Sequence, residues 1–193
     1  MGKIAAIISL VLLLGITVAD AAIVELPLGA EGRYDANSEP WEMDFDLGVT
    51  FTDISHVYID WSGEIMAGLA VDPMRPGPQP FPLDVGLLAY LGRNPGGRLA
   101  TVMGGETTYP EPEIFDCQSE FKIWPPTTWS DLLDGQGTIS IGHVVLVGPY
   151  LAYVEFGFVD LSSATLVVEG TPVPEPGTLF LLAFGAVMLS KKR

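Results

Sequence analysis

Clustered carboxylates are the side chains of this 193-residue chain that could do metal chemistry. Glu111, Glu113 and Asp116 stand among prolines, which predicts a loop. Calcium takes about six to eight oxygen ligands and is often bound in loops of this kind. The sequence therefore suggests a structural Ca²⁺ site at these three residues. The simpler alternative is an acidic surface that is only solvated. The EF-hand run Asp-x-Asp-x-Asp-Gly is absent.

A second acidic group follows one predicted strand. Glu42, Asp44 and Asp46 alternate with apolar residues and fall on the polar face of that strand. Asp44 and Asp46 are the alternative place for calcium, and no other cofactor is expected. Paired carboxylates also hydrolyse glycosides, but 22 acidic residues between Ala22 and Pro172 offer so many pairs that none is informative.

Histidine and cysteine are sparse. Zinc needs about three or four ligands, and His56, His143 and Cys117 show no ligand spacing. Cys117 has no partner for an intrachain disulfide and is expected to be a small buried hydrophobic residue. His143 lies on the apolar face of its strand and is expected to be a satisfied core or edge histidine. No Gly-x-Ser-x-Gly elbow is present, and we expect a protein that is not an enzyme.

The tryptophans offer a different kind of site. Trp124 and Trp129 flank a Pro-Pro-Thr-Thr loop, where exposed rings would stack on sugars. Trp41 and Trp61 fall on the apolar faces of their strands and are assigned to packing. The sequence thus keeps a carbohydrate-binding module open as an alternative function, with Trp124 and Trp129 as its ligand residues.

The charge of the body excludes several partners. Residues 22–172 contain five basic residues against 22 acidic ones, a net charge of −17. Nucleic acid and anionic lipid need clustered lysine and arginine, so neither is an expected partner of the body. Divalent cations and cationic surfaces are the partners that this charge still allows.

The body has the pattern of β-strands. Apolar residues alternate at period two from Trp41 to Phe51, which predicts one half-buried strand, and Gly63-Glu64 predicts a hairpin connection. Prolines predict a loop at 74–82. Further strands are expected at 57–62, 65–71, 84–91, 119–123, 139–147, 150–158 and 164–168. About eight strands with Pro/Gly loops predict an all-β fold, an antiparallel, jelly-roll-like β-sandwich with its first and last strands near each other.

Both ends of the chain are apolar. Ile4 to Val18 forms an almost uninterrupted apolar stretch. Ala19 and Ala21 fit the small-x-small rule of signal peptidase, which predicts cleavage after Ala21, with cleavage after Ala22 as the alternative. Near the other end, a second apolar run from Leu179 to Leu189 predicts a short helix that inserts into the membrane. The basic residues Lys191, Lys192 and Arg193 then stop it on the cytoplasmic side.

The C-terminal tail resembles a known sorting signal. Pro174, Glu175 and Pro176, followed by the apolar run and the basic terminus, resemble the PEP-CTERM protein-sorting signal of Gram-negative bacteria. The same tail is sometimes labelled as the C-terminal region of ice-binding proteins. The body lacks a regular threonine ladder, so that label does not extend to it. Gly177 stands where the family commonly has Ser or Ala.

The resemblance implies a processing route. An exosortase, a membrane-embedded cysteine transpeptidase, is expected to cut near the tripeptide, and proteins with this tail are typically tied to exopolysaccharide, biofilm or cell-surface material. The chain then divides into a signal peptide (1–21), a β-sandwich (22–172) and a sorting tail (173–193). Expected partners are signal peptidase, the exosortase, extracellular polysaccharide and, before processing, the membrane.

Overall fold

The described residues form an antiparallel β-sandwich, as the sequence predicts. The computed structural model describes residues 21–74, 80–91, 98–104, 109–123, 129–130, 132–145, 152–155 and 157–173. Within them lie only strands, turns and irregular segments. In chain order the strands are β1 (Ala22–Pro27), β2 (Gly32–Tyr34), β3 (Trp41–Asp46), β4 (Phe51–Met66), β5 (Gly68–Val71), β6 (Phe81–Leu83), β7 (Val85–Leu91), β8 (Arg98–Gly104), β9 (Glu113–Glu120), β10 (Lys122–Ile123), β11 (Gln136–Val145), β12 (Ala152–Glu155) and β13 (Phe158–Pro172).

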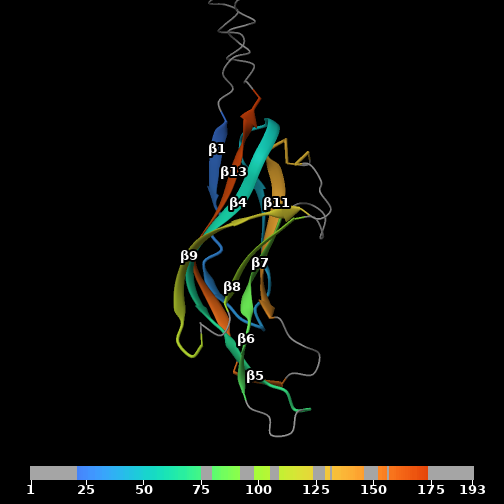
Figure 1. The fold of residues 1–193 in the computed structure, drawn as a ribbon. Coiled ribbons are helices and arrows are strands. Elements are labelled where there is room, and N and C mark those ends of the chain that lie inside the picture. The colour runs from blue at the N-terminus through green and yellow to red at the C-terminus, as the bar shows by residue number, and fades with distance from the viewer. Residues whose placement is uncertain are drawn as a thin grey trace, which may run out of the picture.

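Two five-stranded sheets make up the sandwich (Figure 1). Sheet A has the order β1-β13-β4-β9, with β2 also paired to β13, and sheet B has the order β10-β8-β7-β11-β3. A small third sheet, β12-β5-β6, lies at the end opposite β1. The first and last strands pair along six residues, from Ala22↔Gly170 to Pro27↔Thr165, which confirms that they are neighbours.

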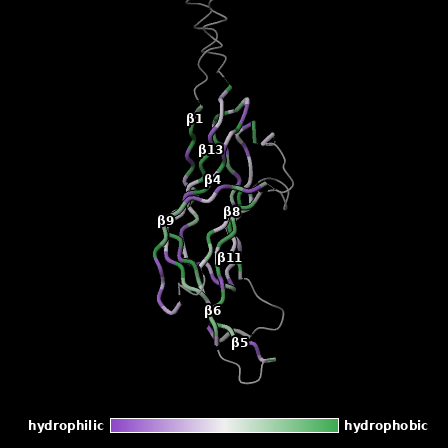
Figure 2. The backbone as a smooth tube through the Cα atoms, in the orientation of Figure 1, coloured by the Kyte–Doolittle hydropathy of each residue, from purple (hydrophilic) through white to green (hydrophobic). Residues whose placement is uncertain are grey.

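The core lies between the inner faces of sheets A and B. Period-two alternation puts one side chain in two toward it, and Figure 2 shows the apolar residues distributed along the strands of both sheets. Trp61 on β4 is 1% exposed and donates its indole N–H to Ser119 Oγ on β9 (3.0 Å). Its fully buried neighbours include Ile59, Leu87, Ile139, Ile141 and Leu166.

The predicted strand from Trp41 to Phe51 is wrong as a single element. β3 ends at Asp46 in sheet B, and β4 begins at Phe51 in sheet A. Between them Gly48 adopts φ +67°, and its N–H donates to Asp46 Oδ1 (2.8 Å). Glycine takes this left-handed conformation without steric cost. The alternation of side chains therefore continues across a turn at which the chain changes sheets.

The predicted hairpin at Gly63-Glu64 is also wrong. Both residues lie inside β4, which runs for 16 residues and pairs with β13 on one side and β9 on the other. A Cβ at Gly63 would collide with the carbonyl oxygen of Asp160 on β13, and would lie 3.1 Å from the Phe115 ring on β9. This glycine is needed for the close approach of three strands rather than for a turn.

Two predicted loops contain strands. Phe81–Leu83 forms β6 despite Pro82, because β6 is the outer strand of the small sheet and an outer strand tolerates a missing N–H. Glu113 and Asp116 lie on β9, not in a loop. Residues 75–79 and the predicted turn at 94–97 lie outside the described residues.

The two predicted terminal segments lie beyond the described part of the chain, which begins at Ala21 and ends at Val173. Within that part, no helix is long and apolar enough to cross a bilayer.

Candidate functional site

The two ends of the sandwich meet at one pole of the molecule. β1 begins where β13 finishes, because the two strands are antiparallel and Ala22 stands opposite Gly170. Figure 1 shows the start of β1 and the tip of β13 side by side, at the end opposite β5 and β6. We call this end, formed by Ala22, Thr50–Thr52 and Gly170–Val173, the terminal pole.

The last residues of β13 are fixed to β4 and to the turn before it. The Val173 N–H donates to the carbonyl oxygen of Thr50 (2.8 Å). Thr52 Oγ1 donates to the carbonyl oxygen of Thr171 (3.1 Å), and Pro172 stands opposite Phe51. The Val173 side chain itself is 43% exposed. The sheet therefore holds the backbone through Val173, while that side chain faces solvent.

Residues 172–193 match the PEP-CTERM protein-sorting motif. The chain carries this sorting motif at its C-terminus. A search of curated proteins found no match to the chain. The matched range includes the predicted Pro174, Glu175, Pro176, Lys191, Lys192 and Arg193, which lie outside the described residues.

The PEP-CTERM motif decides the broad role of the chain. It implies an exported protein that is sorted by an exosortase, with transient anchoring in the membrane and delivery to the cell surface. The match also begins inside the fold, because Pro172 is the last residue of β13 and Val173 is hydrogen-bonded to Thr50. The sorting motif and the sandwich thus share residues at the terminal pole.

The acidic residues of the first predicted calcium site do not all lie on the same element. Glu111 precedes β9, whereas Glu113 and Asp116 lie on it opposite Ile65 and Ser62 of β4. Residues three apart on a strand point to opposite faces. Across the described residues, no three His, Cys, Asp or Glu side chains are placed to hold a metal ion together. The calcium site remains a prediction without a geometric basis in this part of the chain.

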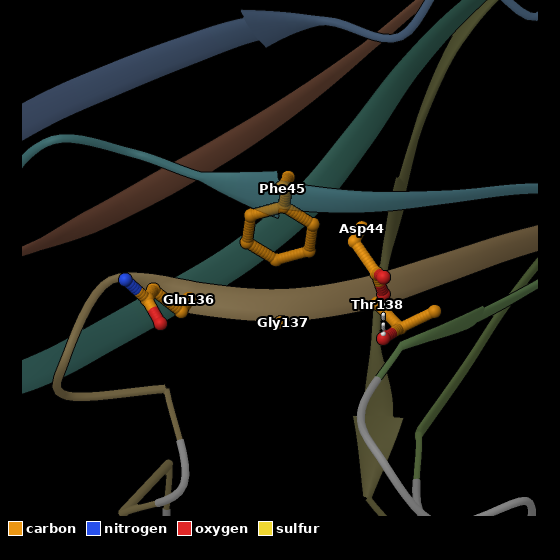
Figure 3. A pocket seen from close by; sticks show the side chains of 5 residues that line it. All are labelled: Asp44, Phe45, Gln136, Gly137 and Thr138. Carbon is orange, nitrogen blue, oxygen red and sulfur yellow. Dashed lines mark hydrogen bonds between the residues drawn. The ribbon is translucent and has the colours of Figure 1, made fainter.

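The second acidic group lies on the outer face of sheet B. Asp44 Oδ1 accepts a hydrogen bond from Thr138 Oγ1 (2.6 Å), and Asp46 Oδ2 accepts one from Gln136 Nε2 (3.0 Å). Figure 3 shows Asp44 and Thr138 with the other residues that line a recess between β3 and β11. The recess has a volume of about 270 Å³. The recess is lined by Asp44, Phe45, Gln136, Gly137 and Thr138. It offers carboxylate, hydroxyl and amide groups that pair with one another across two strands.

An exposed aromatic ring lies on the same outer face of sheet B. Ser140 of β11 stands opposite Glu42 on one side and Tyr90 on the other, so all three side chains share the outer face. Tyr90 is 42% exposed. On its other side it stands opposite the half-buried Leu99 of β8. Sequence patterns do not single out Tyr90, because its neighbours on β7 form a nearly continuous apolar run.

The tryptophans divide differently from the prediction. Trp61 is buried and Trp41 packs against the core, which confirms their assignment to packing. Trp129 was expected to be exposed, but it is half-buried against the same core. Trp124 lies outside the described residues. The partial burial of Trp129 therefore does not favour a sugar-binding pair of exposed rings formed by Trp124 and Trp129.

Cys117 is half-buried on β9 and packs against the core, close to the role predicted for it. Burial raises the pKa of its thiol, and the carboxylates of Asp116 and Asp60 raise it further. Because the thiolate is the reactive form, this cysteine is a poor nucleophile.

His143 departs from its prediction. Its Nε2 is buried and has no hydrogen-bond partner among the described groups, so this ring nitrogen is not satisfied. Burial lowers the pKa of the imidazole, against the opposing effect of the Asp35 carboxylate. His56, in contrast, is exposed and places Nδ1 3.3 Å from Glu120 Oε1.

The lowered pKa of His143 predicts a pH dependence of stability. An unfolded histidine binds its proton at pH about 6.5, while the folded state takes that proton only at lower pH. The unfolded state then binds more protons, so stability falls as the pH drops from about 6.5 through the folded pKa. Urea unfolding at pH 7.5 and 5.5 is expected to show a smaller acid loss for His143→Leu than for the wild type. The exposed His56→Gln is the matched control, and an equal acid loss in wild type and His143→Leu would contradict the prediction.

Proposed function

We propose that the chain is an exported surface or matrix protein of a Gram-negative-type bacterium, with a structural or adhesive, non-enzymatic body that works in exopolysaccharide. The observation that carries this proposal is the sorting motif placed directly at the end of a folded sandwich. In this arrangement the body is the cargo, and the tail serves its delivery.

The position of the two chain ends supports the route. A signal peptide with Lys3 inside and a tail with Lys191, Lys192 and Arg193 inside would leave both ends of the body at the outer membrane-water surface. A body whose ends lay at opposite poles would have to span the distance between them. Here Ala22 and Gly170 are paired neighbours, so both ends reach one membrane surface without distortion.

The polar groups of the body support a role without catalysis. Asp44 and Asp46 are paired with neutral side chains, and burial keeps the Cys117 thiol protonated. Two of the outermost strands, β3 and β9, carry Glu42, Asp44, Asp116 and Glu120. Charged residues on outer strands oppose edge-to-edge aggregation, which suits a protein held at high concentration in a matrix.

A carbohydrate-binding role is the second candidate. It is favoured by Tyr90, an exposed ring on the same outer face of sheet B as the polar recess of Asp44, Gln136 and Thr138. Aromatic faces stack on the apolar faces of sugars, while carboxylates and amides bond to sugar hydroxyls. The net charge of −17 over residues 22–172 favours a neutral or cationic glycan over an anionic one.

Retention of the purified mature protein on the polysaccharide of its host tests the adhesive role. We expect Tyr90→Ala to weaken retention by roughly two- to tenfold, since an aromatic contact contributes about 0.5–1.5 kcal/mol, and to leave the thermal midpoint nearly unchanged. Tyr58→Ala, on the outer face of sheet A, is the matched control and is expected to keep full retention. Equal retention by wild type and Tyr90→Ala would remove the carbohydrate site from this face, and no retention at all would leave a purely structural body.

A further inference from the structure

We propose that Thr171–Val173 belong to the segment that the sorting enzyme binds, and that their release from the sheet limits processing. The inference rests on the proposed exosortase-dependent function and goes beyond it, because it assigns a role to the fold of the body. The partner is a membrane-embedded enzyme that needs an extended substrate.

The first argument is the absence of a spacer. The last backbone hydrogen bond of the described chain is donated by Val173 to Thr50 (2.8 Å), and the Pro-Glu-Pro tripeptide begins at the next residue. The family match itself starts at Pro172, inside β13. An enzyme that acts near the tripeptide therefore meets the sandwich immediately on the N-terminal side of its target.

The second argument is competition for the same backbone groups. Enzymes and receptors that bind extended peptides pair with their main-chain N–H and C=O groups. Here the Val173 N–H already donates to Thr50, and the Thr171 carbonyl already accepts from Thr52 Oγ1. The Val173 N–H has only one hydrogen to donate, so it becomes available only when the end of β13 leaves β4.

The third argument is that the C-terminal end of β13 is held by few backbone hydrogen bonds. β1 pairs with β13 only as far as Gly170, so residues 171–173 are paired on one side alone. The register with β4 shifts between Glu169 and Gly170 and again between Thr171 and Pro172, and Pro172 has no N–H to donate. Strand ends with few backbone bonds open locally while the rest of a domain stays folded.

Gly170 marks where the opening stops. A Cβ there would collide with the carbonyl oxygen of Asp53 and would lie 2.9 Å from the Phe51 ring, so β13 and β4 are in close contact at this residue. From Gly170 toward the N-terminus, β13 is paired with β1 and β4 on both sides. Release of three residues therefore exposes the N-terminal side of the motif without unfolding the body.

Two variants of the full chain test the proposal by pulse-chase in an exosortase-competent host. The first carries a six-residue Gly-Ser spacer between Val173 and Pro174. The second, Asp53→Cys with Thr171→Cys, joins two residues that are partners across β4 and β13, a spacing that suits a disulfide. We expect the spacer to speed processing and the disulfide to slow it roughly tenfold. Reductant should restore the rate, and the spacer should cancel the effect of the disulfide.

The outcomes separate this inference from the function on which it rests. Each single-cysteine variant is the control for the disulfide, and both are expected to be processed at the wild-type rate. Processing of the wild type with no response to spacer or disulfide would overturn the inference and keep the function. A wild-type chain that is never processed would overturn the function, and the inference with it.

Discussion

Replacing Pro174, Glu175 and Pro176 with alanine is expected to leave the C-terminal tail attached and the protein in the membrane fraction. The wild type, in a host with an exosortase, is expected to lose the apolar run and the basic terminus and to reach the cell surface. The reason is chemical: proline restricts its own φ and biases the preceding residue toward an extended backbone, the form that a transpeptidase is expected to bind, and alanine lacks that restraint. Mass spectrometry of the C-terminus, together with fractionation, measures both effects.

The controls for this experiment separate sorting from folding. A host without an exosortase should give the wild type the same intact tail as the alanine variant. Deletion of residues 174–193 should release the body without any processing enzyme, because β13 ends before the deleted segment. An intact Arg193 in the wild type from an exosortase-competent host would show that the motif is not processed.

Gly63→Ala is expected to destabilise the sandwich by about 1–3 kcal/mol, the usual cost of inserting atoms into a well-packed site. The added methyl would meet the backbone of β13 at Asp160, and a backbone oxygen cannot rotate away as a side chain can. β4 is central in sheet A, so a displacement there disturbs its pairing with β13 and with β9. Denaturant unfolding of the mature protein measures the loss as a lower midpoint.

Gly142→Ala is the matched control for this prediction. Gly142 also lies inside a strand, β11, but the nearest atoms to an added Cβ belong to the Pro40 side chain at 3.7 and 3.8 Å, which is ordinary contact. The variant is therefore expected to unfold near the wild-type midpoint. Equal destabilisation by both alanines would mean that general strand effects of glycine, rather than the close approach at Gly63, determine the loss.

The sequence was sufficient for features that depend on local periodicity. Alternating apolar residues around Val57–Trp61 and Ile139–Val145 predicted strands that the structure confirms, because successive side chains on any extended chain point to opposite faces. The sorting motif was equally readable, since its tripeptide, apolar run and basic end are contiguous. Both kinds of signal are complete within a few residues of the chain.

Prediction from local sequence failed where the same residue type is compatible with two different structures. Gly48 is at a turn and Gly63 is inside a strand, although both follow alternating residues. Prolines around Glu111 predicted a loop through Asp116, yet the segment from Glu113 onward pairs with β4. Trp129 was placed in an exposed loop by its neighbours, but it packs against the core. For Gly63 and for the segment from Glu113 onward, the deciding contacts come from residues far away in the chain.

The sequence by itself determined that this is an acidic, exported β-protein with a sorting motif at its C-terminus. Only the tertiary structure decided that Ala22 and Gly170 are neighbours, that Tyr90 and Asp44 share the outer face of sheet B, and that the Val173 N–H is hydrogen-bonded to Thr50. Strand order and register set all three relations. They depend on backbone hydrogen bonds and packing between residues up to about 150 positions apart, which no local pattern encodes.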